Sequence, residues 1–387
     1  MTRGGRAVAA TTPSVAADSR TRVVINAVHA RSGGGVTYLR NILPLLAEDA
    51  RLDLHLFLVE DQMDIFHPID ERIRVHLFPA IKGDIAAMAW EQTSIPFLAR
   101  TIGADVIFSP ANFGCLLSDR NVILLRNALT VARVEPRLSR WVYWTALGVA
   151  TFLSTLRSQK VIAVSHYALR SLTFGFQRFL ERRTAVVYHG VDERFSPDPD
   201  VTREKFVLVV ADLYVQKNLL NFIRAVGLGC RQRPDVRIRI VGSPIDPWYR
   251  DQVLSLVEHL GLGGHVEFLG KRTPDELRDI YRRCLFMAFP STAETFGNPL
   301  VEAMACGTPV ACSNTTAMPE IVADAALLFN PLSPDSIAEA CVRMIDSPDL
   351  RAALSIKGIE RAKFFSWRQT ARLTADALRQ AHRGVAG

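Results

Sequence analysis

Residues 285–311 read LFMAFPSTAETFGNPLVEAMACGTPVA and contain a complete strand–helix–strand pattern. An apolar strand comes first and leads into a loop that contains Gly297. Asn298 is a good N-cap and Pro299 a good first helical residue, so a helix is predicted to begin there and to end near Gly307. A second apolar strand follows the helix. This order is typical of a parallel sheet whose strands are joined by crossover helices.

The same alternation of strands and amphipathic helices extends along the chain in both directions. Strands are predicted over residues 22–28, 52–59, 73–78, 105–108, 122–125, 160–164, 206–210, 237–241, 266–269, 285–288, 309–311 and 326–329. A polar segment near residues 192–203 interrupts the alternation, which then restarts. We therefore predict an α/β protein with two doubly wound, Rossmann-like domains that face a central cleft, the default position for an active site.

The predicted boundaries give the chain four parts. They are a leader over 1–20, a first domain over 21–195, a second domain over 196–365 and a closing C-terminal helix over 366–387. A length of 387 residues is ample for two domain cores. The leader lacks the apolar segment that a signal peptide needs, so we expect it to be disordered.

The composition excludes several classes of protein. The chain has 46 Lys+Arg against 39 Asp+Glu, a net charge of +7, and 49% hydrophobic residues, which excludes a mostly disordered or collagen-like chain. The basic excess is modest, so no nucleic-acid partner is expected. The six cysteines form no CxxC pair, which argues against a zinc ribbon or a disulfide scaffold and favours a cytoplasmic protein.

One apolar segment raises the question of a membrane. Residues 141–156 read WVYWTALGVATFLSTL and are flanked by arginines and a lysine. The segment is shorter than the ~20 residues that span a bilayer. A buried helix of the first domain is the favoured interpretation. The alternative is an interfacial helix whose Trp, Tyr and Arg side chains lie at the headgroups, on the inner face of the cytoplasmic membrane.

Two glutamates flank the start of the helix near 298, Glu294 in the loop before it and Glu302 within it. A helix start offers unpaired backbone N–H groups and partial positive charge, which together bind phosphate. Carboxylates repel phosphate but accept hydrogen bonds from hydroxyl groups, which sugars supply. The pattern therefore indicates a sugar–phosphate ligand such as a nucleotide sugar, although a solvated loop glutamate and an ordinary helix glutamate explain the spacing equally well.

The block ETFGNPLVEAMACGTPV, with Glu294 and Glu302, resembles the signature of retaining glycosyltransferases of the two-domain GT-B type, the glycosyltransferase family 4 type (glycosyl transferases group 1). The resemblance spans residues 22–382, because shorter patterns occur in the order expected for that family. They are Gly34-Gly35, Val164-Ser165, His189-Gly190-Val191-Asp192, Lys217-Asn218, Phe268-Leu269-Gly270, Pro319-Glu320 and Phe365-Ser366-Trp367.

The resemblance implies a role for the matching residues. Lys217 would neutralise the leaving diphosphate, a role that suits a point charge on a flexible stem, and Glu294 would contact the hydroxyls of the transferred sugar. These two are the candidate catalytic residues, and Glu302 would hold the ribose hydroxyls. The other candidate substrate-binding residues offer backbone groups or a side chain near the phosphates, the sugar or the acceptor. They are Gly34, Gly35, Asn127, Phe296, Gly297, Asn298 and Leu300.

Two positions depart from the family pattern. Asp212 stands where relatives often have an arginine, five residues before the lysine. Relatives also often have a histidine in the loop after the strand at 122–125, where this chain has Arg126 and Asn127. Further cleft residues are expected to be structural or solvated, namely His29, His166, His189, Lys271 and Arg272.

We therefore expect transfer of a sugar, with retention of configuration, from a nucleotide-sugar donor to a hydroxyl of a saccharide or lipid-linked acceptor. The first domain would hold the acceptor and the second the nucleotide. No metal and no cofactor are expected, because no DxD-type dyad is clearly placed. A nucleotide-sugar epimerase or hydrolase and a non-catalytic nucleotide-sugar-binding protein are the alternatives. A nicotinamide oxidoreductase is disfavoured because no dinucleotide fingerprint follows either first strand.

Overall fold

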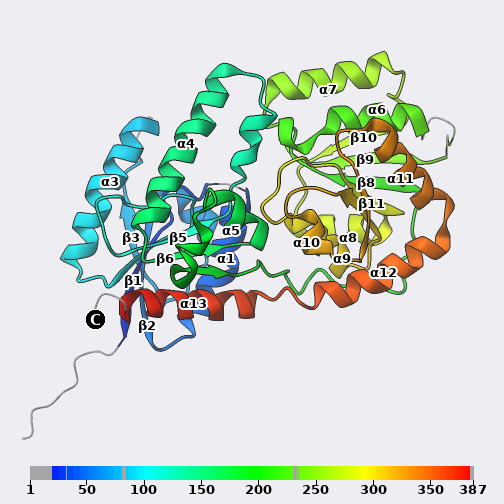
Figure 1. Cartoon of the computed structure of the whole chain (residues 1–387). Helices are drawn as coiled ribbons and strands as arrows, with labels where there is room; N and C mark the ends of the chain where they lie inside the picture. The colour runs from blue at the N-terminus through cyan, green and yellow to red at the C-terminus, as the bar shows by residue number, and fades with distance from the viewer. Residues whose placement is uncertain (1–19, 32, 81–83, 230–232, 234, 384–387) are drawn as a thin grey trace, which may run out of the picture.

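The computed structural model describes residues 20–31, 33–80, 84–229, 233 and 235–383, and it contains two parallel sheets side by side (Figure 1). The first sheet has the strand order β3-β2-β1-β4-β5-β6-β7. Its strands are β1 Thr21–Asn26, β2 Leu52–Val59, β3 Arg74–Phe78, β4 Val106–Ser109, β5 Asn121–Leu125, β6 Lys160–Ala163 and β7 Thr184–Val186. β1 pairs with β2 from Thr21–Leu52 to Asn26–Phe57.

The second sheet has the order β10-β9-β8-β11-β12-β13. Its strands are β8 Phe206–Val210, β9 Arg237–Val241, β10 Val266–Gly270, β11 Phe286–Phe289, β12 Val310–Ser313 and β13 Ala326–Phe329. In both sheets the order reverses beside the first strand, as in doubly wound folds, and ligands bind at such switch points. The predicted fold class is therefore confirmed, and the predicted strands lie within two residues of the observed ones.

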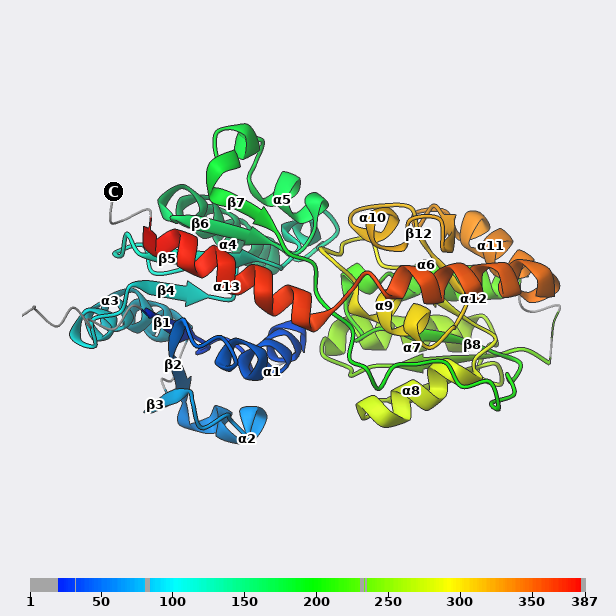
Figure 2. The same ribbon diagram turned by 90° about the horizontal axis from the view of Figure 1, so that it is seen from below.

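Helices cover both faces of each sheet (Figures 1 and 2). The helices are α1 Gly33–Ala47, α2 Met63–Phe66, α3 Asp84–Thr101, α4 Leu138–Arg157, α5 His166–Leu172, α6 Leu219–Gly229, α7 Pro247–His259, α8 Pro274–Arg283, α9 Asn298–Ala305, α10 Met318–Val322, α11 Pro334–Asp346, α12 Pro348–Ala362 and α13 Trp367–Arg383. Because both faces are covered, strands such as β5 (NVILL) are buried at every position, which explains their continuous apolar sequence. The predicted leader lies, apart from Arg20, outside the described residues.

The chain crosses between the two sheets twice. It leaves the first sheet after β7 and returns before α13, which packs against α1 and the first sheet (Figure 2). The two crossings lie together, since the amide of Val191 donates to the carbonyl of Phe365 (3.2 Å). Gly190 is required there, because a Cβ at this position would overlap the backbone of Trp367. The last helix is thus part of the first domain's core, with Leu378 fully buried.

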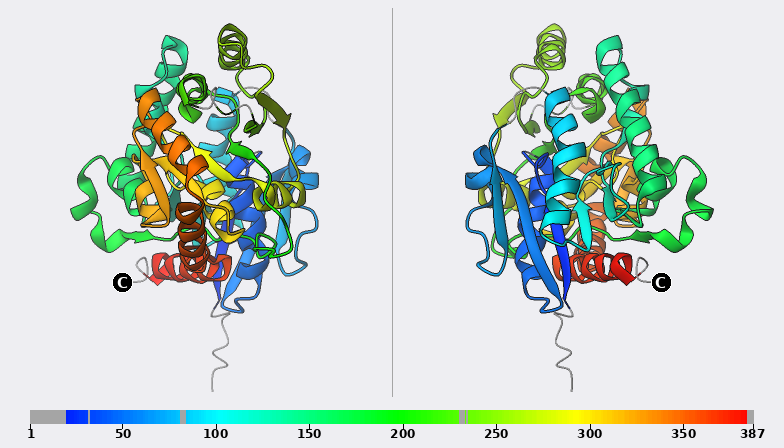
Figure 3. Two further views of the ribbon diagram at one scale, coloured as in Figure 1. Left: turned by 90° about the vertical axis from the view of Figure 1, so that its right-hand side faces the viewer. Right: turned by 90° about the vertical axis from the view of Figure 1, so that its left-hand side faces the viewer.

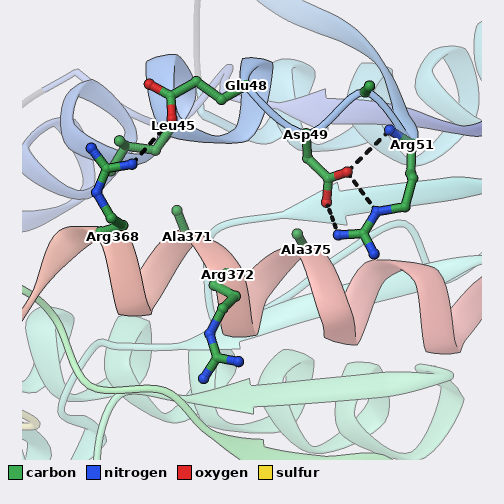
Figure 4. Close-up of a pocket in the computed structure, with 9 residues that line it drawn as sticks. Leu45, Glu48, Asp49, Arg51, Arg368, Ala371, Arg372 and Ala375 are labelled. Atoms are coloured by element: carbon green, nitrogen blue, oxygen red, sulfur yellow. Dashed lines mark hydrogen bonds and ion pairs between the residues drawn. The ribbon is translucent and has the colours of Figure 1, made fainter.

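A groove of about 290 Å³ lies between the end of α1 and α13 (Figure 4). Ala371 and Ala375 point from α13 toward α1, which lets the helices approach closely. The acidic groups at its rim are paired with arginines, as the Asp49 carboxylate is with Arg51 at 2.8 Å. The groove therefore serves helix packing.

Helix α4 contradicts the interpretation of 141–156 as a buried helix. Its buried side chains are hydroxyl-bearing, namely Thr151, Ser154 and Thr155, and they bond to backbone groups, as Thr155 does to the carbonyl of Thr151 (2.8 Å). Several of its large apolar side chains, including Trp141 and Tyr143, are exposed, and the others are half-buried. The hydroxyl groups can face the interior because each finds a backbone partner. Among the described residues no helix is long and apolar enough to span a bilayer.

Candidate active site

A cavity of about 480 Å³ lies between the two domains, at the carboxyl ends of the strands on both sides. The first domain contributes loops after β5 and at the start of α1, and the second contributes loops after β8 and β11. The residues that line it include Gly34, Arg126, Asn127, Trp144, His189, Asp212, Tyr214, Lys217, Lys271, Arg272, Glu294, Phe296, Gly297 and Asn298. The cavity thus contains most of the predicted site residues.

Lys217 and Glu294 form an ion pair in this cavity, with 2.7 Å between Nζ and Oε1. Lys217 ends a short turn after β8, and the next residue, Asn218, has φ of 56°. The Asn218 amide anchors this left-handed turn by donating to the carbonyls of Pro290 and Pro331 (3.0 and 2.7 Å). Burial lowers the pKa of Lys217, but Glu294, together with smaller contributions from Tyr214 and Asp212, outweighs this effect and the pKa is raised. Lys217 therefore stays charged and is held beside a carboxylate.

The start of α9 faces the same cavity. Gly297 is the N-cap, with φ of 91°, so the helix begins at Asn298, one residue earlier than predicted. The reason is that the Asn298 side chain does not cap the helix and instead bonds through Oδ1 to His189 Nδ1 (3.0 Å). Leu300 lies outside the cavity, because its side chain is buried and its amide donates to the carbonyl of Gly297 (3.0 Å).

Glu302 also lies outside the residues that line the cavity. It sits further along α9 and accepts a hydrogen bond from the hydroxyl of Tyr281 (3.0 Å). Burial raises the pKa of Glu302 to about 7, although the Tyr281 bond acts against this shift. The structure therefore brings Glu294 and Lys217 together in the cavity, whereas Glu302 lies outside it, against Tyr281.

On the first-domain side, Asn112 fixes the loop after β5. Its side-chain oxygen accepts the amides of both Arg126 and Asn127 (2.8 and 2.9 Å). Gly34 lines the cavity, whereas Gly35 lies against the guanidinium of Arg126. Arg126 and Asn127 thus occupy the edge of the cavity where relatives often have a histidine.

Asp212, which stands where relatives often have an arginine, also lines the cavity. Its Oδ1 accepts the amide of Ser243 (2.7 Å), so it organises the loop after β9. Lys271 and Arg272 lie at the rim, and Arg272 pairs with Glu276 (3.4 Å). Among the described residues, no cluster of three or more His, Cys, Asp or Glu side chains is arranged to hold a metal ion.

The three histidines have different surroundings. Burial lowers the pKa of His189 to about 4, so it is neutral, and its ring stacks on Trp367 at 5.5 Å. The ring of His166 packs on Tyr188 near the surface. His29 pairs with the buried carboxylate of Glu91 (2.5 Å), outside the cavity lining.

Contacts between the domains were not expected from the sequence. The Glu320 carboxylate of α10 accepts the amides of His166 and Tyr167 at the start of α5 (2.7 and 2.8 Å). It also accepts the hydroxyl of Tyr188 (2.9 Å). The pattern Pro319-Glu320 was visible in the sequence, but nothing in it indicated which groups it would bind. These bonds hold the two walls of the cavity together.

A second contact between the domains lies near α4 and α7, which are at the same end of the molecule, away from α13 (Figure 3). Arg137 donates to Asp246 across the domains (3.0 Å) and also pairs with Glu135 (2.7 Å). Its guanidinium lies 4.6 Å from the ring of Trp248. Sequence reasoning also missed Trp144, which lines the cavity although it belongs to the segment interpreted as buried or interfacial.

Comparison with known proteins shows which family part of the chain resembles. Residues 192–361 match the family model described as Glycosyl transferases group 1. This part of the chain is a glycosyl transferases group 1 domain. The chain is 30% identical over 174 residues to O-antigen chain mannosyltransferase B of Escherichia coli, covering 45% of each chain. It is 32% identical over 207 residues to a D-inositol 3-phosphate glycosyltransferase of Corynebacterium glutamicum, covering 49% of this chain and 50% of that one.

The match to these curated relatives thus spans about half of their length. Among solved structures, the chain superposes on HepE of Anabaena, determined in complex with UDP and glucose, with a TM-score of 0.75. The identity is 20%, and the superposition covers 93% of this chain and 100% of that one. The likeness shows that the group 1 domain and the first domain together have the same two-domain fold as HepE.

Proposed function

We propose that the protein is a retaining glycosyltransferase that moves a sugar from a nucleotide-sugar donor to a hydroxyl of a saccharide or lipid-linked acceptor. The observation that carries the proposal is the Lys217–Glu294 pair beside the start of α9, in a cavity that both domains line. The mannosyltransferase and glycosyltransferase names of the relatives support it. Synthesis of polysaccharide, lipopolysaccharide or glycolipid is the proposed setting.

The proposed chemistry places the developing negative charge on the leaving diphosphate. The bond between the sugar's anomeric carbon and the diphosphate oxygen breaks, and the oxygen keeps the electron pair. Lys217 and the backbone N–H groups at the start of α9 stabilise that charge. The acceptor oxygen forms the new bond on the same face of the sugar, and its proton passes to the leaving phosphate oxygen. No metal or cofactor is part of this proposal.

Glu294 has two tasks in this scheme. Before the donor arrives, its carboxylate compensates the charge of Lys217 and keeps the lysine in the cavity. When the diphosphate takes over the lysine, the Glu294 carboxylate is free to accept hydrogen bonds from sugar hydroxyls. Glu302 is proposed to contribute to the nucleoside end, although it does not line the cavity.

A donor screen tests the proposal. Nucleoside diphosphates and nucleotide sugars are added one at a time, and the rise in unfolding temperature reports their affinity. The best donor is then used in transfer assays with wild type, Lys217→Met and Lys205→Met, the last being an exposed lysine paired with Asp235. We expect transfer to fall about 100-fold or more in Lys217→Met alone. Equal transfer in all three proteins, or no stabilisation by any nucleotide, would overturn the proposal.

The same assay separates the alternatives. Donor consumption without an acceptor indicates a hydrolase or an epimerase, which product analysis distinguishes. Stabilisation by a nucleotide sugar without any turnover indicates a binding protein. Product stereochemistry tests retention, because an inverted anomeric centre excludes the proposed same-face route.

We also propose that the exposed face of α4 contacts a membrane surface. It carries Trp141, Tyr143 and Leu153, and a second set of exposed rings follows α5. The two sets meet, because the ring of Phe152 in α4 packs on those of Phe174 and Phe176, each at 5.6 Å. Exposed arginines belong to the same two segments; they are Arg140, Arg157, Arg178 and Arg182. Aromatic rings next to arginines suit the headgroup region of an anionic bilayer.

Vesicle sedimentation tests this contact. Wild type should bind vesicles that contain phosphatidylglycerol and not pure phosphatidylcholine, and Trp141→Ser with Tyr143→Ser should reduce binding several-fold. Transfer to a water-soluble acceptor should be unchanged in that variant. Equal vesicle binding by wild type and variant would exclude α4 as the contact.

A further inference from the structure

Arg126 stands out among the cavity residues because its position is fixed. Its amide donates to Asn112, and its carbonyl accepts the hydroxyl of Thr295 from the second domain. Its Nε donates to the carbonyl of Pro110 (2.8 Å), which sets the direction of the guanidinium. The outer nitrogens lie over Gly35 at the start of α1, where a Cβ would come within 2.5 Å of Nη2.

The charge of Arg126 has no counter-charge among the described residues. No carboxylate there is paired with the guanidinium, and the nearby Tyr38 hydroxyl, whose pKa burial raises, is uncharged at neutral pH. Burial lowers the pKa of Arg126 to about 10, so it remains a cation at neutral pH. A largely buried cation without an anion is costly, and the cost is removed when an anionic ligand binds.

The opposite wall of the cavity lacks the second cation that the family pattern would place there. Asp212 occupies that position, and its carboxylate is bound to the amide of Ser243. Lys217 is already paired with Glu294, Arg272 is paired with Glu276, and Lys271 is exposed to solvent at the rim. Arg126, in the first domain, is therefore the cation that is held in place without a paired carboxylate among the described residues. It lines the same cavity as Lys217.

We propose that Arg126 binds phosphoryl oxygens of the donor's diphosphate from the first-domain side, opposite Lys217. This inference rests on the proposed function and adds one consequence to it. A diphosphate held by Lys217 on one domain and by Arg126 on the other draws the domains together. Thr295, next to Glu294, already bonds to the backbone of Arg126, so the two cations are linked through one interdomain contact.

Calorimetric titration with a nucleoside and with its diphosphate tests the proposal. In Arg126→Gln, we expect affinity for the nucleoside diphosphate to fall about 10- to 100-fold, with nucleoside affinity unchanged. Arg126→Lys should recover part of the loss. Arg72→Gln, an exposed arginine paired with Asp70, is the matched control and should bind like wild type.

Stability provides a second readout that a merely structural arginine would not give. Removing an uncompensated buried charge should leave the urea unfolding midpoint of Arg126→Gln equal to or above that of wild type. A lower midpoint with unchanged diphosphate affinity would overturn the proposal.

The failures of the two proposals can be told apart. Wild type that binds no nucleotide overturns the proposed function and this inference with it, whereas equal diphosphate binding by wild type and Arg126→Gln overturns only the inference. If the variant keeps its diphosphate affinity but loses affinity for inorganic phosphate or a phosphorylated sugar, the donor assignment is overturned and Arg126 belongs to the acceptor site.

Discussion

Replacing Lys217 by Met removes one partner of the ion pair with Glu294 and leaves the side-chain volume nearly unchanged. Both side chains are only 13% exposed, so the Glu294 carboxylate would be left without its cation and with little water. We therefore expect this variant to unfold more easily than wild type in the absence of any ligand. The prediction concerns the free protein and does not depend on which reaction it catalyses.

The size of the expected loss in free energy of unfolding follows from the geometry of the ion pair. At the Nζ–Oε1 distance of 2.7 Å, the Coulomb attraction at an effective dielectric constant of about 20 is about 6 kcal/mol. Desolvation of the two charges opposes it, and removing one partner of a buried pair costs about 3–5 kcal/mol. Because some solvent reaches both groups, we expect a loss of about 3 kcal/mol. For a domain of this size that lowers the unfolding temperature by about 6–12 °C.

Urea unfolding followed by circular dichroism measures the loss. Adding Glu294→Gln to the Lys217→Met variant removes the carboxylate that has lost its partner. It should restore about half of the lost free energy of unfolding. Lys205→Met, which breaks an exposed pair with Asp235, should change the free energy of unfolding by less than about 1 kcal/mol. If Lys217→Met is as stable as Lys205→Met, the pair does not exist in solution and the reasoning is refuted.

Three further predictions follow from other parts of the structure. Because the pKa of Glu302 is raised from 4.5 to about 7, the folded protein holds a proton there that the unfolded chain releases, so stability should fall by up to about 3 kcal/mol as pH rises from 4.5 to 7. Glu302→Gln should flatten this slope in urea unfolding at several pH values, and an unchanged slope would contradict the assignment. Gly190→Ala should destabilise by about 1–3 kcal/mol because its methyl group meets Trp367, whereas Gly34→Ala, with open space around it, should not; equal unfolding midpoints would rule out the close crossing. Arg137→Gln should raise the radius of gyration in small-angle X-ray scattering, since it removes a bond between the domains; an unchanged radius would show that this bond does not hold the cleft closed.

Most of the fold could be predicted because strand patterns are local. Runs such as Phe206–Val210 are apolar throughout. Helices such as α7 and α8 begin with recognisable caps, Asp246 and Thr273. Helix α4 was harder, because an apolar sequence predicts burial whichever way the helix is turned. Its orientation is set by Thr151 and Ser154, whose hydroxyl groups find backbone partners in the interior.

The candidate site was predictable to the extent that its residues share one loop. Glu294 and Gly297 lie in the same segment, so the sequence placed them together, and the family pattern added Lys217. Glu302 is close in sequence but lies one helical turn beyond Asn298, where its carboxylate accepts the hydroxyl of Tyr281 and does not line the cavity. The Arg137–Asp246 contact could not be predicted, since its partners are 109 residues apart and meet only when the domains do.

The position of α13 has a consequence for the order in which the protein can fold. The first sheet is synthesised early, but Leu378 and its neighbours, which complete that core, are synthesised only after the whole second domain. Domains usually fold as units in the order of synthesis. Here the N-terminal domain must wait with part of its core uncovered while the whole second domain emerges and folds. The cavity between the domains therefore takes shape only after the second domain has been made and α13 has docked against the first sheet.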